Sequence, residues 1–529
     1  MHVEKFCDRN LGGLTCARCI SGTVGEGKCR MTNMNVNEKS DKIVVPVKQP
    51  NKGGKTSAEV VEGRVLAKGN SQQTAADWTQ GQRTASFGLS AVRKVAKEEK
   101  GTQFTALLHH ITPDLLGESY FALKRNAAAG IDGMTWKAYG VQLNKRLQVL
   151  HARIHSGKYR ANPARRTYIP KADGSQRPLS IWCIEDKIVQ QAVVQVLNAI
   201  YEEDFIGFSY GFRPGRGQHD ALDALQVGLY RKKISWVLDA DIQKFFDEVD
   251  HEWMMKFLQH RIADKRILRL IRKWLTVGIT ENGKTHRTSK GTPQGAVISP
   301  VLANIYLHYA FDLWANKWRN SQAQGDMIII RYADDSIIGF QRESDARLFV
   351  EQFSERMHKF GLTLHPDKTR LIRFGRYAAK ERRARGEKKP ETFDFLGFTH
   401  YCTKTRKGWF KVGRKSIKKR IQGQIQTIKE ELRRRLHEPI QETGEWLKRV
   451  LQGHLNYYAV SGNGPSLNYF FERIKWYWLR SLRRRSQRHR MPWERFKVLL
   501  KRFFPPVRIL HPQPLHRFDA RTQGRSPVR

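Results

Sequence analysis

The sequence predicts an α+β fold in its central part and an all-α region after it. Apolar residues recur with helical spacing over 185–205, which is typical of an amphipathic helix packed against a core. Apolar runs at 234–242 and 327–340 are instead typical of buried strands, and polar residues divide the second run as in a hairpin. After about residue 412 a helical stripe surrounded by basic residues consists of Ile417, Ile421, Ile425, Ile428 and Leu432.

Composition predicts a polyanionic partner. The 529-residue chain has 95 Lys and Arg against 50 Asp and Glu, a formal net charge of +45 at pH 7. Such a chain repels itself unless a polyanion neutralises it, so we expect nucleic acid binding. A ribosomal-type or merely well-solvated protein is the alternative. No window approaches the roughly 18 consecutive apolar residues of a membrane helix, so we expect a soluble, cytoplasmic and bacterial protein without a membrane partner.

The N-terminal segment 1–85 differs in composition from the rest. It is poor in aromatic residues and rich in Gly, Lys, Ser, Thr and Gln, which predicts a disordered or accessory arm. A start at Met31 or Met34 is the alternative. Four of the six cysteines lie here, at Cys7, Cys16, Cys19 and Cys29. A zinc knuckle is conceivable, but the irregular spacing favours an unstructured leader.

Two acidic positions stand out between 86 and 400. The hairpin predicted at 327–340 carries Asp334 and Asp335 at its turn, and Asp241 follows the apolar run that begins at 234. Adjacent carboxylates resist ionising together unless a cation lies between them. If the two strands are neighbours, the three carboxylates converge and form a site for divalent metal ions. Solvated turns with paired aspartates are the structural alternative.

Basic residues dominate both the segment 376–391 and the C-terminal end. The first, "RYAAKERRARGEKKPE", is predicted to be a charged loop. The range 471–529 has 17 Lys and Arg against three acids, interleaved with aromatic residues. This composition suits phosphates and stacked bases, although aromatics at helical spacing also form cores. The aromatic residues are Trp476, Tyr477, Trp478 and Trp493.

Seven motifs follow one another between residues 168 and 398, and an eighth lies beyond them, within a match that runs from about residue 86 to about 500. They read "YIPKADGSQRPLSI", "SYGFRPGRG", "LDADIQKFFDEVDH", "GTPQGAVISPVLANIYLH", "RYADDSIIGF", "LTLHPDKTRLI", "FDFLGF" and "LQGHLNYYAVSGN". In this order they resemble the reverse transcriptases encoded within group II introns, and the eighth resembles their maturase (X) domain. The resemblance implies a right-hand polymerase with fingers and palm over 86–400, a thumb and maturase X domain over 401–475, and a basic nucleic-acid-binding tail over 476–529.

The resemblance also implies roles for single residues. Asp241, Asp334 and Asp335 would be catalytic and would bind Mg²⁺, with the backbone carbonyl of Ile242 as a further ligand. Nucleotide-binding roles fall to Lys171, Arg177, Phe246, Gln294, Gly295 and Lys368. The first two have side chains that suit triphosphate oxygens. The Phe246 ring would occupy the space of a 2′-OH, and Lys368 is either a proton donor to pyrophosphate or a phosphate anchor.

Two further motifs are predicted to bind RNA. One contributes Arg213 and Arg216, and "GHLNYY" contributes His454, Asn456, Tyr457 and Tyr458, for which a buried turn between helices is the alternative. The "FLGF" motif would lie near the primer terminus. The expected partners are the chain's own group II intron RNA, a DNA target and primer, and dNTPs; the sequence predicts no oligomeric state.

We therefore expect an RNA-directed DNA polymerase that also promotes splicing and mobility of its intron. One alternative is a reverse transcriptase of a retron, a diversity-generating element or a CRISPR system. A second is a splicing factor that binds RNA without catalysis, but all three aspartates are present. No cysteine follows Tyr458, so we expect no HNH endonuclease domain of the kind that carries paired cysteines.

Overall fold

The computed structural model describes residues 78–170, 176–281, 283–286, 288–485, 491–511 and 513–522, with side chains from residue 88 onward. The four N-terminal cysteines, for which an unstructured leader is predicted and a zinc knuckle is the alternative, lie outside the described residues. So does Lys171, which is predicted to bind nucleotide. No helix in these ranges is long and apolar enough to cross a membrane.

Helices form the first part of the described chain and pack around α5 (Ile184–Asp204), the helix predicted at 185–205. Both α1 and α2 contact α5, whose apolar side chains are almost all buried. The side chain of Thr112 caps α2 by accepting a hydrogen bond from the Leu115 N–H. The elements are α1 (Trp78–Glu98), η2 (Leu108–His110), α2 (Pro113–Ala122), α3 (Trp136–Gly140) and α4 (Leu143–His155).

A four-stranded sheet, here called the N-terminal sheet, flanks these helices. Its strand order is β2-β1-β4-β5, with β1 antiparallel to β2. The strands are β1 (Ala164–Pro170), β2 (Gln176–Ile181), β4 (Ile279–Glu281) and β5 (Lys284–His286). The helices that surround β4 and β5 in the chain are α8 (His251–Gln259), α9 (Lys265–Thr276) and α10 (Ser299–Leu307).

A second sheet, here called the central sheet, has the strand order β6-β7-β3-β8 and confirms the predicted strand and hairpin. Its two faces contact separate cores, because side chains alternate along a strand. Leu238 and Ile338 face the core that contains α10 and α12, whereas Val237 and Ile337 face the core that contains α6. The elements are β3 (Trp236–Ala240), β6 (Met327–Tyr332), β7 (Asp335–Phe340), β8 (Arg370–Arg373), α6 (Gln218–Arg231) and α12 (Glu343–Lys359).

Three shorter helices lie between β3 and β6 in the chain. These are α7 (Phe245–Glu248), η3 (His308–Asp312) and α11 (Leu313–Ser321). The predicted charged loop at 376–391 is wrong in part, because α13 (Ala378–Ala384) forms within it. Arg382 of this helix pairs with both Glu387 and Glu391, so part of the charge of the segment is balanced within it.

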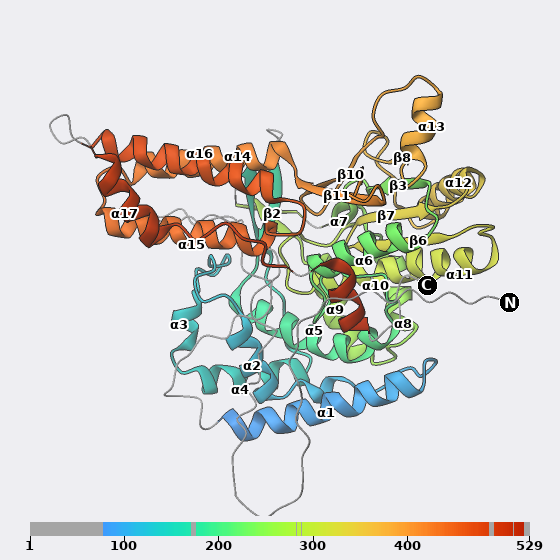
Figure 1. The fold of residues 1–529 in the computed structure, drawn as a ribbon. Helices are drawn as coiled ribbons and strands as arrows, with labels where there is room; N and C mark the ends of the chain where they lie inside the picture. The colour runs from blue at the N-terminus through green and yellow to red at the C-terminus, as the bar shows by residue number, and fades with distance from the viewer. Residues whose placement is uncertain are drawn as a thin grey trace, which may run out of the picture. The chain divides into compact units, whose positions relative to one another are not determined.

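A third sheet, the C-terminal sheet, leads into the helical region. It has the order β11-β10-β9, from β9 (Phe393–Phe395), β10 (Phe398–Lys404) and β11 (Phe410–Ser416). The chain is helical from α14 onward, but the all-α region predicted to begin at 401 is wrong at its start, because the end of β10 and all of β11 lie within it. Among these helices α14 lies beside α16, whereas α15 contacts α17 (Figure 1). They are α14 (Lys418–Arg434), α15 (Ile440–Tyr458), α16 (Gly464–Arg483) and α17 (Trp493–Phe503).

The last helix, α18 (Pro514–Thr522), packs against α6 instead of extending away from the chain. Arg517 forms an ion pair with the buried Asp223 of α6, and Arg231 forms a bidentate pair with Asp519 at 2.8 and 3.0 Å. Just before α18, the N–H of His511 donates to the carbonyl of Ala459 at the end of α15. The segment 510–522, predicted as part of a nucleic-acid-binding tail, therefore makes intramolecular contacts with α6 and α15.

Candidate active site

The strand register brings two of the predicted catalytic carboxylates opposite each other. β3 and β7 are antiparallel, with Ala240 paired to Ser336. One further step in this register sets Asp241 against Asp335. On the other side of β7, Tyr332 pairs with Asp335, so the β6–β7 turn consists of Ala333 and Asp334. All three aspartates thus lie at one end of the central sheet.

Like charges gather at this end of the sheet. Desolvation, then the carboxylates of Asp334, Asp241 and Asp239, raise the pKa of Asp335 to about 7. The Asp335 side chain is nevertheless exposed, so a cation from solvent can reach it. Desolvation also raises the pKa of Asp239 to about 6, with further contributions from Asp394 and Asp241. Sequence reasoning missed Asp239, although it lies two residues before Asp241 and therefore on the same face of β3.

The loop after α12 holds the end of β3 in place. The His365 N–H donates to the carbonyl of Asp241 at 2.8 Å, and the Gln243 N–H donates to the carbonyl of Thr363 at 2.8 Å. These two bonds flank Ile242 and fix the orientation of its peptide groups. The same loop supplies Lys368.

The ammonium of Lys368 neutralises one of the carboxylates. Its Nζ lies 2.6 Å from Asp241 Oδ2, and its side chain is 63% exposed. The hydrogen bond to Asp241 is the main reason that the pKa of Lys368 is raised. The structure therefore places Lys368 beside the candidate site, and its ammonium occupies a position where a cation balances Asp241.

The donor set fits a hard divalent cation, although the ligands are not assembled around one. In the part of the chain that the structure describes, no three His, Cys, Asp or Glu side chains form a ready metal-binding group. The opposed Asp241 and Asp335 and the adjacent Asp334 supply carboxylate oxygens, the ligands that Mg²⁺ prefers. Their mutual repulsion, seen in the raised pKa of Asp335, is relieved by a cation. Lys368 bonds Oδ2 of Asp241, so an ion that uses this oxygen competes with the ammonium.

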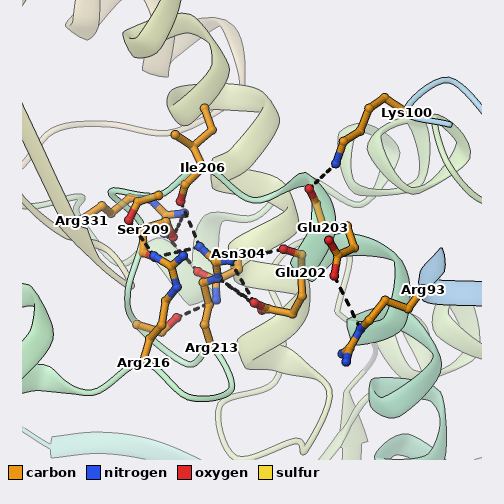
Figure 2. A network of polar contacts seen from close by, with 12 residues as sticks. Arg93, Lys100, Glu202, Glu203, Ile206, Ser209, Arg213, Arg216, Asn304 and Arg331 are labelled. Carbon is orange, nitrogen blue, oxygen red and sulfur yellow. Dashed lines mark hydrogen bonds and ion pairs between the residues drawn. The ribbon is translucent and has the colours of Figure 1, made fainter. Parts of the chain in front are cut away.

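A buried arginine anchors the turn that carries Asp334. The Arg331 side chain is 1% exposed, and its Nε and Nη2 donate to the two carboxylate oxygens of Asp312 at 2.7 and 2.5 Å. Its Nη1 donates to the carbonyl of Ala333 at 2.9 Å and to Asn304 Oδ1 at 3.1 Å, and its Nη2 donates to Ser209 Oγ at 2.7 Å (Figure 2). Ala333 has φ +58, a left-handed conformation that these contacts help to hold.

The "SYGF" segment packs directly under the same turn. The Tyr210 N–H donates to the carbonyl of Arg331, and the Arg331 N–H donates to the carbonyl of Phe208, both at 2.9 Å. A Cβ on Gly211 would lie 2.3 Å from the backbone nitrogen of Ala333. Only glycine therefore allows this loop to approach the turn so closely.

The assignment of Arg213 to RNA binding is corrected by its contacts, whereas that of Arg216, which is only partly buried, stays a prediction. Arg213 is 6% exposed, and its guanidinium binds the carboxylate of Glu202 and the carbonyls of Ile206 and Ser209 (Figure 2). Arg216 donates to the carbonyls of Gly207 and Ser209. The guanidinium groups of both residues donate hydrogen bonds to carbonyls of the loop at 206–209, and these bonds stabilise the loop beneath the turn that carries Asp334.

The "TPQG" motif connects the N-terminal sheet to α7. The Ser180 N–H of β2 donates to the carbonyl of Gln294 at 2.7 Å, and the Thr292 N–H donates to the carbonyl of Phe246 at 2.7 Å. Gly295 has φ +99, and a Cβ there would lie 2.6 Å from the Ser180 carbonyl oxygen. The glycine thus has a structural role against β2. Nucleotide binding by Gln294, Phe246 and Arg177 of β2 stays a prediction.

The "GHLNYY" motif forms the end of α15, and its proposed RNA contacts are corrected for two residues. His454 is completely buried: its Nδ1 lies 2.9 Å from Gln424 Oε1, and its ring stacks on Phe470 at 3.8 Å. Tyr458 is also buried. Asn456 is partly buried, and its carbonyl lies 2.7 Å from His511 Nε2. The predicted alternative, a buried segment of a helical bundle, describes His454 and Tyr458.

Tyr457 instead supports the "FLGF" turn. Leu396 and Gly397 both have positive φ, +46 and +83, and join β9 to β10 as a two-residue hairpin turn. Tyr457 Oη donates to the carbonyl of Leu396 at 2.8 Å. Arg420 of α14 lies against the position of Gly397, and its charge lowers the pKa of Asp335. Arg420, which lies beside this turn, is thus close enough to Asp335 to stabilise its ionised carboxylate.

Comparison with known proteins agrees with this geometry. Residues 169–400 match the family model described as reverse transcriptase (RNA-dependent DNA polymerase), a range that contains both sides of the carboxylate site. Protein YkfC of Escherichia coli (strain K12) is 34% identical over 46% of this chain and 72% of its own length.

Relatives named for introns share the same region. The group II intron-encoded protein LtrA of Lactococcus lactis subsp. cremoris is 34% identical over 42% of this chain, but that match spans only 37% of LtrA. Nuclear intron maturase 1, mitochondrial, of Arabidopsis thaliana is 29% identical over 16% of the chain and 12% of its own length. The family match, the similarity to YkfC and the intron-encoded relatives agree with the carboxylate arrangement: this chain belongs to the reverse transcriptases of the group II intron-encoded type.

Proposed function

We propose that this chain copies RNA into DNA at the Asp241, Asp334 and Asp335 site, and that it also binds the RNA of a group II intron as a maturase. The observation that carries the proposal is the register that opposes Asp241 and Asp335 next to the turn with Asp334. In this reading the N-terminal sheet belongs to the fingers, the central sheet is the palm, and α14–α17 form the thumb and X domain.

The reaction is attack of a primer 3′-OH on the α-phosphate of a dNTP, with release of pyrophosphate. Two divalent ions, which we expect to be Mg²⁺, would supply charge neutralisation for the attacking and leaving oxygens. The carboxylates hold these ions, because hard cations prefer oxygen ligands. Arg177 and Lys171 would bind the triphosphate, and Phe246 would bear on the sugar.

Lys368 can change partners during this cycle. It balances Asp241 in the structure described, and a cation bound at Asp241 would free its ammonium for phosphate oxygens. An exposed, flexible ammonium suits either phosphate anchoring or proton donation to the leaving pyrophosphate. The surroundings of Lys368 thus support the predicted nucleotide-binding role.

The maturase function rests on other surfaces. The relatives named for introns and the net charge of +45 support binding of intron RNA. His454 and Tyr458 are not available for it in this structure, so we assign RNA contact to exposed basic and aromatic side chains. Trp476 on α16 is one such side chain, flanked by Arg473 and Arg480 at 5.5 and 5.2 Å from its ring centroid.

The test is the variant Asp334→Asn, which keeps the size of the side chain and removes its charge. We expect loss of primer extension on an RNA template, while splicing of the intron in the presence of the protein continues. Asp114→Asn is the matched control, because it makes the same change in the first turn of α2, outside the carboxylates of the central sheet; it should retain most of the activity. Wild-type extension by Asp334→Asn, or loss of splicing in a folded Asp334→Asn protein, would contradict the proposal.

A further inference from the structure

The β10–β11 hairpin has one face in the core and one face turned outward. Phe398 pairs with Ser416 and Lys404 with Phe410, and residues along each strand alternate between the faces. Phe398, His400 and Val412 are buried on the inner side. The opposite side, here called the outer face, consists of Thr399, Tyr401, Thr403, Lys411, Gly413 and Lys415.

The hairpin ends in a well-defined tip at 405–409. The Thr405 N–H donates to the carbonyl of Trp409 at 2.8 Å, and the Trp409 N–H donates to Thr405 Oγ1 at 3.1 Å. Gly408 provides the left-handed residue of the turn, with φ +81. Trp409 is opposite Thr405 and so continues the outer face. Its side chain is 70% exposed, the largest fraction among the exposed large apolar side chains of the described residues.

A second aromatic ring lies flat on the same face. Tyr401 is paired with Gly413, and a Cβ on Gly413 would lie 2.3 Å from Tyr401 Cζ. The glycine therefore lets the ring lie across the neighbouring strand. Lys415 Nζ is 5.6 Å from the centroid of this ring. Tyr401 and Trp409 are separated by four residues of strand, roughly 14 Å at about 3.4 Å per residue.

The charge around these rings is strongly positive. Four cations belong to the outer face and the tip: Arg406, Lys407, Lys411 and Lys415. Asp394, which pairs with Thr399 at the base of the hairpin, is held by the Thr399 hydroxyl at 2.6 Å. Aromatic rings on a sheet face, with cations between them, suit stacked bases and phosphates of an unpaired strand.

We propose that the outer face and the tip of the β10–β11 hairpin bind a single-stranded segment of RNA, with bases on Tyr401 and Trp409 and phosphates on the lysines. This inference rests on the proposed function, because it assigns one RNA contact of the same protein. An unpaired strand fits better than a duplex, since the faces of paired bases are covered by their neighbours. The spacing of the two rings requires a strand of several nucleotides.

The position of the hairpin separates this contact from the reaction centre. Asp394 at its base is near enough to raise the pKa of Asp239. From Thr399, the partner of Asp394, to Thr405 at the tip the strand covers six residues, roughly 20 Å. Trp409 therefore contributes to RNA affinity without touching the reacting nucleotides.

The experiment measures binding of the full chain to a labelled 12-nucleotide RNA without secondary structure, by fluorescence anisotropy, next to primer extension on a short primed template at saturating concentration. Trp409→Ala should weaken RNA binding about 5- to 150-fold, the range for one stacked base, and Trp409→Phe should retain most of the affinity. Tyr230→Ala, which removes another exposed aromatic ring from α6, is the matched control. Lys411→Gln should lower the slope of log affinity against log salt by about 0.7.

The outcomes separate this inference from the proposed function. Unchanged RNA affinity in Trp409→Ala, while the wild-type protein binds RNA and extends primers, would overturn the inference alone. An equal loss of affinity for a fully paired duplex would overturn base stacking. Absence of both RNA binding and primer extension in the wild-type protein would overturn the proposed function and this inference with it.

Discussion

The anchoring of the catalytic turn by Arg331 leads to a prediction that separates stability from activity. Replacing Arg331 with Met leaves the Asp312 carboxylate, which is completely buried, without its bidentate partner. It also removes the hydrogen bond to the Ala333 carbonyl that holds the left-handed residue next to Asp334. Loss of the ion pair lowers the stability of the whole fold, and loss of the hydrogen bond to Ala333 lowers the rate of primer extension.

The magnitudes follow from burial. Breaking a buried ion pair by removing one partner costs about 3–5 kcal/mol in free energy of unfolding, because a charge is left uncompensated. The double variant Arg331→Met/Asp312→Leu removes both charges, and such apolar replacements are often neutral in stability. It does not restore the bond to Ala333. A displacement of about 1 Å at a reacting group costs on the order of 100-fold in rate.

The assays are urea denaturation and primer extension on an RNA template. We expect Arg331→Met to lose about 3–5 kcal/mol, and the double variant to regain most of that stability while extension stays on the order of 100-fold slow. Arg347→Met is the control, because its pair with Glu343 is exposed and should be worth about 0–1 kcal/mol. Recovery of extension together with stability in the double variant would refute the positioning role of Arg331.

Three further predictions concern other contacts. Gly211→Ala should lower the free energy of unfolding by about 1–3 kcal/mol and slow primer extension, because the new Cβ meets the backbone of Ala333. Gly423→Ala, in open space on α14, should be neutral or stabilising; equal effects of the two substitutions would contradict the contact. Desolvation raises the pKa of the buried Asp186 to about 7, so its contribution to stability is lost as pH rises from about 4 through 7. The stability gained by Asp186→Asn should therefore grow by about 3 kcal/mol between pH 5 and pH 8 in urea titrations, and a constant difference would count against this. Arg517→Ala should lower the free energy of unfolding by about 3 kcal/mol and speed proteolysis near α18. Arg231→Ala breaks the exposed pair between α6 and Asp519 of α18 and should lower it by less than about 1 kcal/mol; the reverse order would contradict the assigned roles.

The carboxylate site was predictable because the residues next to each aspartate in the sequence specify the strand that carries it. Apolar runs on both sides of Asp334 and Asp335 specify a hairpin, and a run before Asp241 specifies the neighbouring strand. Pairing of two buried strands then leaves few registers, because a slip of one residue turns every side chain to the other face. The strand register brings the three aspartates to one end of the sheet, as this argument predicts, and metal binding by them stays a prediction.

The fate of single charged residues was not predictable in the same way. Arginine and histidine are common on RNA-binding surfaces, which is why Arg213 and His454 were predicted there. In the structure their hydrogen-bond partners are Glu202 and Gln424, and the sequence pattern does not reveal these contacts. One signal was available for Arg213: a short Gly- and Pro-containing loop exposes backbone carbonyls, which are natural acceptors for a guanidinium. The helix within 376–391 was not predicted because the charge of the segment suggested a solvated loop, whereas Arg382 of the helix pairs with two glutamates that follow it.

The contact between α18 and α6 has a consequence for the timing of folding. Asp223 and Arg517 are 294 positions apart in the chain. At about 5–20 residues per second, a ribosome needs roughly 15–60 s to travel between them. During that interval Asp223 and its more distant partner Arg414 are already made, and Arg517, which hydrogen-bonds the acid, is not. The nascent protein is therefore expected to mature in two stages, with the polymerase region compact first and the closure onto α6 completed only when the final helix emerges.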